Sequence, residues 1–379
     1  MDSSEKKDGS VKSKTGCMER RLEGRDASDH VHHVVALIPA HDEAAAIRRA
    51  VEGLKAQTVP PTRIIVLADN CADDTAAIAL SAGAEVFETV GNVHKKAGAL
   101  NQVLRHLLPE LSDETLVLVQ DADSTLDIPF LENATTTLAD PRLGAVGGTF
   151  RGCKGAGFVG HLQRNEYARY ARDVRRLQGK CLVVTGTAAV LRVCTIRQVS
   201  DARVAGIIPA GDGHGGVYDT TVLTEDNELT FAIRHLGYDV LSPTGCTLET
   251  EVMTSWHDLW SQRLRWKRGA LENCFQYGLT RITWPYWGRQ LLALLGVQVT
   301  VIYLGTLVWA AATSTFALSS FWIGVTGIFM VERIITVSDR GWRYMLPAGL
   351  MYEVVYDLFL QCVHATAYAA VLFRRERSW

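Results

Sequence analysis

Short apolar runs alternate with helical stretches between residues 34 and 250. Strands are predicted at Val34–Ile38, Ile64–Ala68, Glu85–Glu88 and Leu116–Val119, with helices over Glu43–Ala56, Asp74–Ala82 and Lys96–Leu107. This β-α-β-α-β order predicts an α/β fold with a mostly parallel sheet, helices on both faces and a ligand site beyond the carboxyl ends of the strands. No glycine follows the first strand in PAHDE (39–43), which argues against a dinucleotide-binding dehydrogenase and a P-loop enzyme.

A long uncharged run follows in the C-terminal third of the chain, from Gln290 to Val331. As one helix it would be roughly 63 Å long, about twice the thickness of a bilayer's hydrocarbon core. We therefore expect a hairpin of two membrane helices, roughly 290–312 and 317–337, broken near Thr313–Ser320. A buried helical pair in a soluble protein is the alternative, and the length of the run disfavours it.

A third apolar segment, Met345–Phe373, contains Glu353, Asp357 and His364. At about 100° per residue these three side chains share one helical face, within about 40° of one another. Acidic groups are costly in lipid, so this face is expected to meet protein or a polar passage. Whether the segment spans the membrane, re-enters it or lies at its surface stays open, because a third span would place Arg374, Arg375 and Arg377 against the positive-inside rule.

Charge and composition exclude several classes of protein. The formal net charge is −2 and the pI is about 6.6, without the basic stripe that nucleic-acid binding requires. The 8 cysteines are scattered singly, which argues against a structural zinc site or a disulfide framework and fits a reducing cytosol. Residues 1–30 are charged, lack the apolar core of a signal peptide and predict a disordered cytosolic tail.

Acidic side chains follow three of the predicted strands. Asp42 and Glu43 follow the first, Asp69 the second, and Asp121 and Asp123 the fourth. Carboxylates gathered at one sheet edge suit a hard divalent cation, which would in turn hold phosphate oxygens. For the acidic residues that open the next helix, Asp73 and Asp74, helix capping is an equal alternative.

The segment KAGALN (96–101) places Lys96 at the mouth of a helix, where a lysine and the helix dipole can both meet a phosphate. A solvated basic turn is an equally good interpretation. Glycine-rich GDGHGGVYD (211–219) predicts a mobile loop near the site rather than a phosphate cradle.

Seven motifs in order resemble the family 2 glycosyltransferases: PAHDE, DNCADDT (69–75), KAGALN, DAD (121–123), TGT (185–187), TED (224–226) and QRLRW (262–266). The likeness is closest to the membrane-embedded branch of hyaluronan, chitin, cellulose and poly-N-acetylglucosamine synthases. It implies a GT-A fold, inversion of the anomeric configuration, and a nucleotide-sugar donor used with Mg²⁺ or Mn²⁺.

The resemblance also implies roles for individual residues. The general base would be Asp226, next to Glu225; donor-binding residues would be Glu43, Asp69, Lys96, Asp121, Arg263 and Arg265; acceptor-binding residues would be Thr185, Gly186, Thr187, Gln262 and Trp266; metal ligands would be Asp123 and Asp121. Because Asp226 opens a helical stretch, a capping role is the alternative for it.

The sequence departs from the family pattern at three places. Asp42 stands where the family usually has Asn, the proline common before QRLRW is missing from ETEVMTSW, and no apolar helix precedes the catalytic segment.

The expected organisation is a tail (1–30), a catalytic domain (31–250), interfacial helices (251–288), a membrane region of two or three helices (289–373) and a basic tail (374–379). A membrane part this small argues against a long polymer channel.

The leading hypothesis is a membrane-bound enzyme, with its catalytic domain in the cytosol, that moves a sugar from UDP-N-acetylglucosamine or UDP-glucose to a growing glycan. Alternatives are single-sugar transfer to a polyprenyl phosphate or a protein, and an inactive membrane-anchored sugar-binding protein.

In SQRLRWKRG (261–269), Gln262 and Arg265 share one helical face and Arg263 and Trp266 another. One face is expected to meet the donor and acceptor. Trp256, Trp260 and Lys267 suit the membrane interface.

Overall fold

The computed structural model describes residues 33–315 and 320–375. Its contacts divide the chain into two units, 1–150 with 177–250 and 151–176 with 251–379. The division differs from the expected one at residues 151–176, which were placed in the catalytic domain and here cluster with the C-terminal helices. The predicted tails, 1–30 and most of 374–379, lie outside the described residues.

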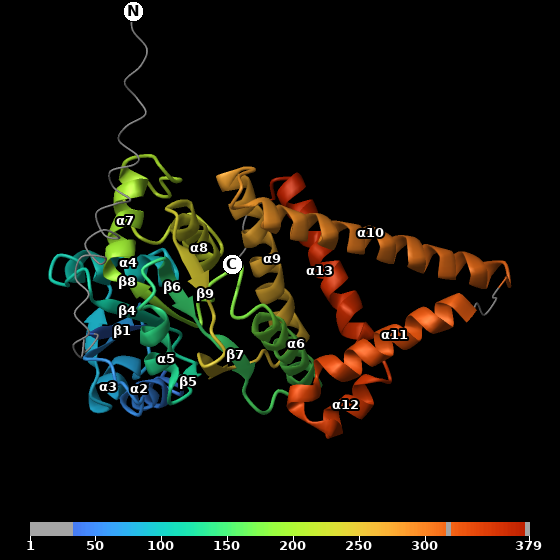
Figure 1. The fold of residues 1–379 in the computed structure, drawn as a ribbon, viewed down its shortest axis with the longest axis horizontal. Helices are drawn as coiled ribbons and strands as arrows, with labels where there is room; N and C mark the ends of the chain where they lie inside the picture. The colour runs from blue at the N-terminus through green and yellow to red at the C-terminus, as the bar shows by residue number, and fades with distance from the viewer. Residues whose placement is uncertain (1–32, 316–319, 376–379) are drawn as a thin grey trace, which may run out of the picture. The chain divides into compact units, whose positions relative to one another are not determined.

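The first unit is built on a seven-stranded mixed sheet (Figure 1). Its strands are β1 (Val34–Ala40), β2 (Arg63–Ala68), β3 (Glu85–Glu88), β4 (Leu116–Gln120), β6 (Leu143–Gly147), β8 (Ala188–Arg192) and β9 (Asp239–Leu241). They lie in the order β3-β2-β1-β4-β8-β6-β9. The four predicted strands are parallel to one another, whereas β8 runs antiparallel to both β4 and β6.

Helices cover both faces of this sheet, as predicted. Figure 1 shows α4 (Lys95–Leu107), α7 (Val193–Val204) and α8 (Glu225–His235) on one side and α2 (Ile47–Lys55), α3 (Thr75–Ser81) and α5 (Phe130–Thr137) on the other. The central strands β1, β4 and β8 are buried almost throughout and consist largely of Val, Leu, Ile and Ala, as expected for strands covered on both faces. A small second sheet, β5 (Thr125–Leu126), β10 (Thr247–Thr250) and β7 (Thr149–Gly152), lies beside them in the order β5-β10-β7.

One predicted helix begins later than expected. The sequence predicts helix from Glu43, but α2 begins at Ile47. The backbone amides of Glu43 and Ala44 donate instead to Thr75 Oγ1 at 2.8 Å and Asp73 Oδ2 at 3.0 Å. These side-chain bonds satisfy amides that would have no acceptor within the helix, while the Glu43 carbonyl accepts from Ala46 N at 3.0 Å and Ile47 N at 2.9 Å as the turn leads into α2.

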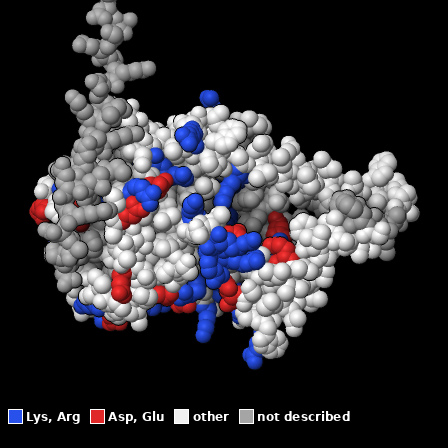
Figure 2. All heavy atoms as spheres, in the orientation of Figure 1, with Lys and Arg blue, Asp and Glu red and all other residues white. Residues whose placement is uncertain are grey.

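The second unit is helical. It comprises α6 (Gly157–Arg176), α9 (Trp256–Tyr277), α10 (Trp284–Ala312), α11 (Ser320–Thr336), the 3-10 turn η1 (Ser338–Arg340), α12 (Trp342–Ala348) and α13 (Val354–Leu372). The predicted break of the uncharged run is confirmed, since α10 ends at Ala312 and α11 begins at Ser320. Figure 2 shows no Lys, Arg, Asp or Glu on the visible face of the part of α10 and α11 that extends to the right of the view.

Two helices of the described chain are long and apolar enough to cross a membrane, α10 and α13. The most apolar window of α10 is 0% buried and that of α13 is 22% buried. From the sequence, the second membrane helix was expected at 317–337, which corresponds to α11 and not to α13. Helix α11 is 17 residues long and carries Glu332 and Arg333 near its end. The predicted polar face of α13 does meet protein, because Glu353 is 1% exposed and is bound by Arg169 and Arg333.

Candidate functional site

The acidic loops meet at one edge of the sheet. Strand β1 lies between β2 and β4 and is parallel to both, so the residues that follow the three strands gather at their common carboxyl edge. Asp69 comes directly after β2 and Asp121 directly after β4, while Glu43 lies in the loop after β1.

The loops after β1 and β2 are fastened together through Asp42. Its Oδ1 accepts hydrogen bonds from the backbone amides of Ala72 at 2.7 Å and Asp73 at 3.3 Å. Asp42 has a positive φ of 56°, a conformation in which Asp and Asn are enriched. Asp42 therefore adopts the backbone conformation and accepts the loop hydrogen bonds that the more usual Asn could, and it adds a negative charge beside the loop.

Asp69 is buried and tightly held. Its Oδ1 accepts hydrogen bonds from Thr89 Oγ1 at 2.7 Å, Asn92 Nδ2 at 2.8 Å and Asn70 Nδ2 at 3.2 Å. Three donors on one carboxylate oxygen fix the orientation of the side chain, which suits a residue that must recognise a ligand group by direction.

The antiparallel strand β8 brings TGT beside DAD. Gln120 pairs with Ala188, and the backbone amide of Asp121 donates to Thr187 O at 3.1 Å. Thr185 Oγ1 and Thr187 Oγ1 lie 3.0 Å apart. The predicted metal and acceptor residues are therefore direct neighbours.

Lys96 lies at the centre of this group. Its Nζ donates to Asp121 Oδ1 and to Gly186 O at 2.8 Å, and lies 3.9 Å from Glu225 Oε1. Burial alone would lower the pKa of Lys96, but the carboxylates of Asp121, Glu225 and Asp226 outweigh it and hold that pKa above its usual value. The lysine is thus a permanent cation, a quarter exposed, rather than a solvated basic turn.

Asp226 lies in the first turn of α8, whose N-cap is Thr224. The carboxylate Oδ2 of Asp226 accepts a hydrogen bond from the backbone amide of Gly186 at 2.9 Å, and Oδ1 accepts one from Asn227 N at 2.7 Å. Asp226 is therefore not the N-cap residue, and one of its oxygens is turned across to the TGT loop. The loop, the lysine and the carboxylate form one connected cluster.

A pocket opens at this cluster. Its polar wall consists of Lys96, Thr185, Gly186, Glu225 and Asp226, and strand and α8 side chains such as Val119, Leu191 and Leu229 form its apolar wall. A Cβ on Gly186 would lie 3.2 Å from Lys96 Nζ and 3.3 Å from Asp226 Oδ2. The glycine is therefore needed for this close approach.

Sequence analysis missed Tyr218, which also lines the pocket. The segment that carries it was predicted to be a mobile loop, but Tyr218 is 5% exposed and its backbone amide and carbonyl both bond to the Asn101 side chain, at 2.9 and 2.8 Å. Burial, together with Glu225, Asp226 and Asp121, raises the pKa of the Tyr218 phenol despite the opposing effect of Lys96, so the phenol stays protonated. Asn101, the last residue of KAGALN, is a sequence feature that could have located this tyrosine, because its side chain forms both of the hydrogen bonds to the Tyr218 backbone.

The other predicted site residues lie on α9, in the C-terminal unit. Arg263 is 5% exposed and forms an ion pair with Glu166 of α6, with Nη2 and Oε2 2.6 Å apart, and its guanidinium stacks 4.4 Å from the Trp266 ring. Within its unit Arg263 thus fixes α9 to α6. Arg265 and Trp266 are exposed, and Gln262 accepts a hydrogen bond from Arg263.

Asp121 and Asp123 have the chemistry of a divalent cation site. Both are partly exposed carboxylates, and Ser124 Oγ orients Asp123 by donating to its Oδ1 at 3.0 Å. Among the described residues, a tighter group is Asp42, Cys71 and Asp73, whose ligand atoms all lie within 4.8 Å of one another. In that group Asp42 and Asp73 bind backbone amides of the two loops, just as Asp121 binds Lys96 and Asp123 binds Ser124, so each of these carboxylates has at least one oxygen engaged within the protein.

Comparison with known proteins agrees with this geometry. Residues 35–199 match the sequence model described as Glycosyl transferase family 2. Among relatives, the probable glycosyltransferase YdaM of Bacillus subtilis is 26% identical over 392 residues, covering 94% of this chain and 87% of that protein. Poly-beta-1,6-N-acetyl-D-glucosamine synthase of Staphylococcus aureus is 24% identical over 291 residues, covering 73% of this chain and 65% of the synthase, slightly less than two thirds of its length.

Among solved structures, a mannosyltransferase from Pyrobaculum calidifontis, in complex with GDP-Man and Mn²⁺, superposes with a TM-score of 0.60 at 18% identity. The match covers 97% of this chain and 99% of the mannosyltransferase. At this identity the likeness concerns the fold, which is that of the GT-A enzymes. The chain is therefore a glycosyltransferase whose residues 35–199 match family 2, with a GT-A fold followed by apolar C-terminal helices.

Proposed function

We propose that the protein is a membrane-bound, inverting enzyme that transfers a sugar from a UDP-sugar to a hydroxyl group of a growing glycan. UDP-N-acetylglucosamine and UDP-glucose are the favoured donors. The observation that carries the proposal is the cluster of Asp226, Gly186 and Lys96, which places a carboxylate base and a fixed cation side by side at one pocket. The synthase relative supports the choice of donor and acceptor.

In this reaction the acceptor oxygen attacks the anomeric carbon, the bond from that carbon to the diphosphate breaks, and UDP leaves. Asp226 takes the proton of the attacking hydroxyl, a step for which general-base catalysis supplies about 10²–10⁴-fold in rate. The amides of Gly186 and Asn227 each donate to one oxygen of the Asp226 carboxylate and orient it, and each oxygen keeps a further lone pair for the acceptor hydroxyl. Thr185 and Thr187 offer hydroxyl groups to the acceptor sugar.

Glu43 and Asp69 would bind the nucleobase, and Lys96 would stabilise the negative charge that develops on the leaving diphosphate. A divalent metal, held by Asp123 and Asp121, would supply further charge neutralisation when bound. Lys96 forms an ion pair with Asp121. The diphosphate would bind to Lys96 and the metal to Asp121.

On α9, Arg265 stays a predicted donor-binding residue, and Gln262 and Trp266 stay predicted acceptor-binding residues. Arg263 carries a weaker case for donor binding, because Glu166 already neutralises its buried guanidinium. Membrane attachment is proposed through α10 and α13, since the apolar surface of α10 is left uncovered within the described chain. The catalytic unit would then lie in the cytosol.

The test uses the full chain in detergent. It is offered UDP-N-acetylglucosamine, UDP-glucose and, because fold likeness does not decide the nucleotide, GDP-mannose, each with Mg²⁺ or Mn²⁺. Release of UDP and product mass are measured. We expect UDP release with one of the two favoured donors and products longer than one sugar.

Products that carry a single sugar would contradict chain growth and favour single-sugar transfer to a polyprenyl phosphate or a protein. GDP release alone would overturn the UDP-sugar proposal. No turnover of any donor with glycan, lipid-phosphate or protein acceptors would favour the inactive sugar-binding protein.

A further inference from the structure

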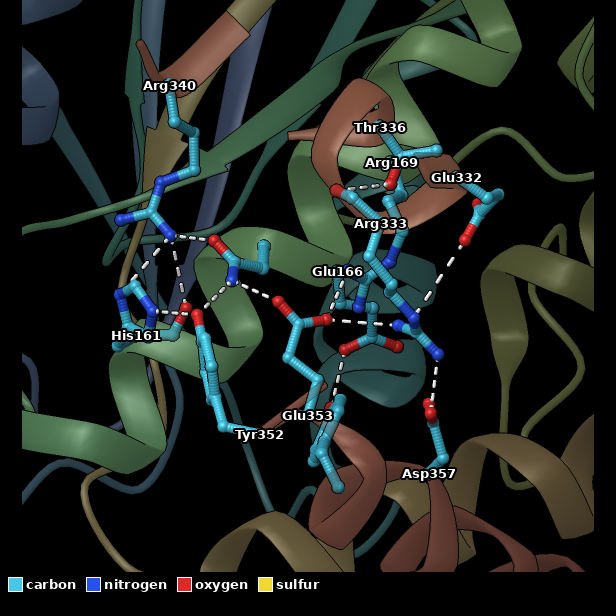
Figure 3. A network of polar contacts seen from close by, with 12 residues as sticks. His161, Glu166, Arg169, Glu332, Arg333, Thr336, Arg340, Tyr352, Glu353 and Asp357 are labelled. Carbon is cyan, nitrogen blue, oxygen red and sulfur yellow. Dashed lines mark hydrogen bonds and ion pairs between the residues drawn. The ribbon is translucent and has the colours of Figure 1, made fainter. Parts of the chain in front are cut away.

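The C-terminal unit contains a polar network that joins α6 to the segments around α11, α12 and α13 (Figure 3). In one half of it the charges are balanced. Buried Glu353 forms ion pairs with Arg169 and with Arg333, whose Nη1 lies 3.0 Å away, and Arg333 also pairs with Asp357. The positive and negative charges in this half of the network balance one another, so no charged ligand is needed there.

The other half contains Arg340, which has only neutral partners. Its Nη1 donates to Asn165 Oδ1 and to the backbone oxygen of His161 at 3.3 Å, and its guanidinium lies 4.2 Å from the centre of the Tyr344 ring. Across residues 33–315 and 320–375, no carboxylate lies within ion-pair distance of Arg340. Its positive charge is half-buried and uncompensated.

Arg164 on α6 is a second such cation. Its Nη1 donates to the backbone oxygens of Cys153 at 2.9 Å and Gly155 at 2.8 Å, and it too lacks a carboxylate partner in the described part of the chain. Burial first, and then repulsion from Arg164, lowers the pKa of Arg340. Burial, followed by both arginines, lowers the pKa of His161 as well, so this histidine, which contacts Arg340 and precedes Arg164 by three residues on α6, is neutral at pH 7.

The surroundings of this pair are apolar and exposed. Trp342 is 67%, Phe158 51% and Tyr344 39% exposed. Phe158 lies against Tyr352, which in turn stacks on His161. Aromatic side chains next to arginines are typical of surfaces that meet lipid headgroups. An anion delivered from an apolar phase therefore matches this place better than a soluble acidic peptide.

We propose that Arg164 and Arg340 bind the phosphate group of an anionic phospholipid. Guanidinium groups form paired, charge-assisted hydrogen bonds with phosphate oxygens, and here the phosphate supplies the missing counter-charge. The acyl chains would lie against the exposed aromatic side chains. The proposal rests on the membrane attachment proposed above, and it is independent of the donor and of the transfer reaction.

The experiment measures lipid retention by native mass spectrometry of the detergent-purified full chain. The probes are phosphatidylglycerol, diacylglycerol with the same acyl chains but no phosphate, and inorganic phosphate as a competitor. We expect phosphatidylglycerol to be retained at least about tenfold better than diacylglycerol, and inorganic phosphate to displace little of it. Efficient displacement by millimolar inorganic phosphate would overturn the lipid source in favour of free phosphate.

The variants are R340Q, R164Q and, as a matched control, R176Q. Arg176 is exposed on the same helix as Arg164 and has no carboxylate partner among the described residues. R340Q and R164Q should each lower phosphatidylglycerol retention about tenfold, R176Q should not, and R340K, which keeps the charge but not the paired hydrogen bonds, should restore only part of it. Because Arg340 also holds Asn165, R164Q keeps the test decisive if R340Q does not fold.

Unchanged retention in R164Q, or equal loss in R176Q, would contradict the proposal. UDP release is measured on the same samples. Lost retention with normal UDP release supports the lipid site, and an absence of UDP release in every sample would count against the proposed function while leaving the retention result readable.

Discussion

The carboxylate of Asp226 accepts a hydrogen bond from the backbone amide of Gly186 at 2.9 Å, across 40 residues of sequence. The same glycine's carbonyl accepts from Lys96 at 2.8 Å. One peptide segment thus holds the proposed base on one side and the fixed cation on the other. Changes to any of the three residues should act on the chemical step more than on the fold.

Replacing the proposed base tests this most directly. Asp226→Asn keeps the size of the side chain and removes the proton acceptor, and its single amide oxygen can accept from only one of the two backbone amides, Gly186 N or Asn227 N. We expect kcat for sugar transfer to fall about 10²–10⁴-fold with little change in donor affinity. The control is Glu132→Gln, an exposed residue on α5. Full activity of Asp226→Asn would eliminate Asp226 as the base.

Gly186→Ala tests the close approach at the loop. The added Cβ would lie 3.2 Å from Lys96 Nζ and 3.3 Å from Asp226 Oδ2, so both side chains must shift by a few tenths of an ångström. A displacement of about 1 Å can cost 10²-fold in rate, so we expect about a tenfold loss of kcat here, with an unchanged unfolding temperature. In the control, Gly288→Ala, the added Cβ meets nothing within 4 Å. An activity equal to wild type in both variants would contradict the positioning argument.

A buried ion pair stabilises the helix that carries Asp226. Arg203, at the end of α7, pairs with Glu228 of α8, and their side chains are 1% and 0% exposed. Arg203 also donates to Pro209 O at 2.8 Å and Val217 O at 3.1 Å, at either end of the glycine-rich loop. Helix and loop are therefore held by one guanidinium.

Arg203→Met should lower the free energy of unfolding of the catalytic unit by about 3–5 kcal/mol, because the fully buried carboxylate of Glu228 would lose the guanidinium that pairs with it. The double variant Arg203→Met/Glu228→Met should recover part of this loss. Denaturant unfolding of the wild type, both single variants and the double variant gives the coupling energy. Additive losses would show that the two side chains do not stabilise each other.

The pattern of apolar runs was enough to predict the four parallel strands and the acidic loops at their common edge, because βαβ connections make consecutive parallel strands end at the same edge. Contacts that depend on the antiparallel strand β8 could not be predicted, since nothing local shows that Thr187 returns beside Asp121. The assignment of α6 to the C-terminal unit was also beyond the sequence, because its partners Arg263 and Glu353 lie about 100 and 190 residues away.

Lys267 provides a prediction for pH dependence. Its Nζ donates to Gln290 Oε1 at 2.6 Å and lies 5.0 Å from the Tyr368 ring, and no carboxylate pairs with it among the described residues. Burial lowers the pKa of Lys267 to about 8, below the value near 10.4 of an unfolded lysine. Between these two values the unfolded chain binds more protons than the folded one, so this group makes stability rise with pH from about 8 to about 10.4.

Lys267→Met removes that dependence together with the cost of burying an unpaired charge. We expect the variant to unfold at a higher temperature than the wild type at pH 7, and the difference to shrink as the pH is raised from 8 to 10. Groups that do not interact with Lys267 titrate alike in both proteins and cancel in the comparison. The Cys274 thiol is the exception, because Lys267 opposes the burial that raises its pKa to about 11, but it titrates above this pH range. Thermal unfolding in detergent at a series of pH values measures this difference, with Lys154→Met, at an exposed position, as the control. A difference that stays constant from pH 7 to 10 would mean that Lys267 is not a depressed lysine, and that Gln290 and Tyr368 compensate its charge as well as water does.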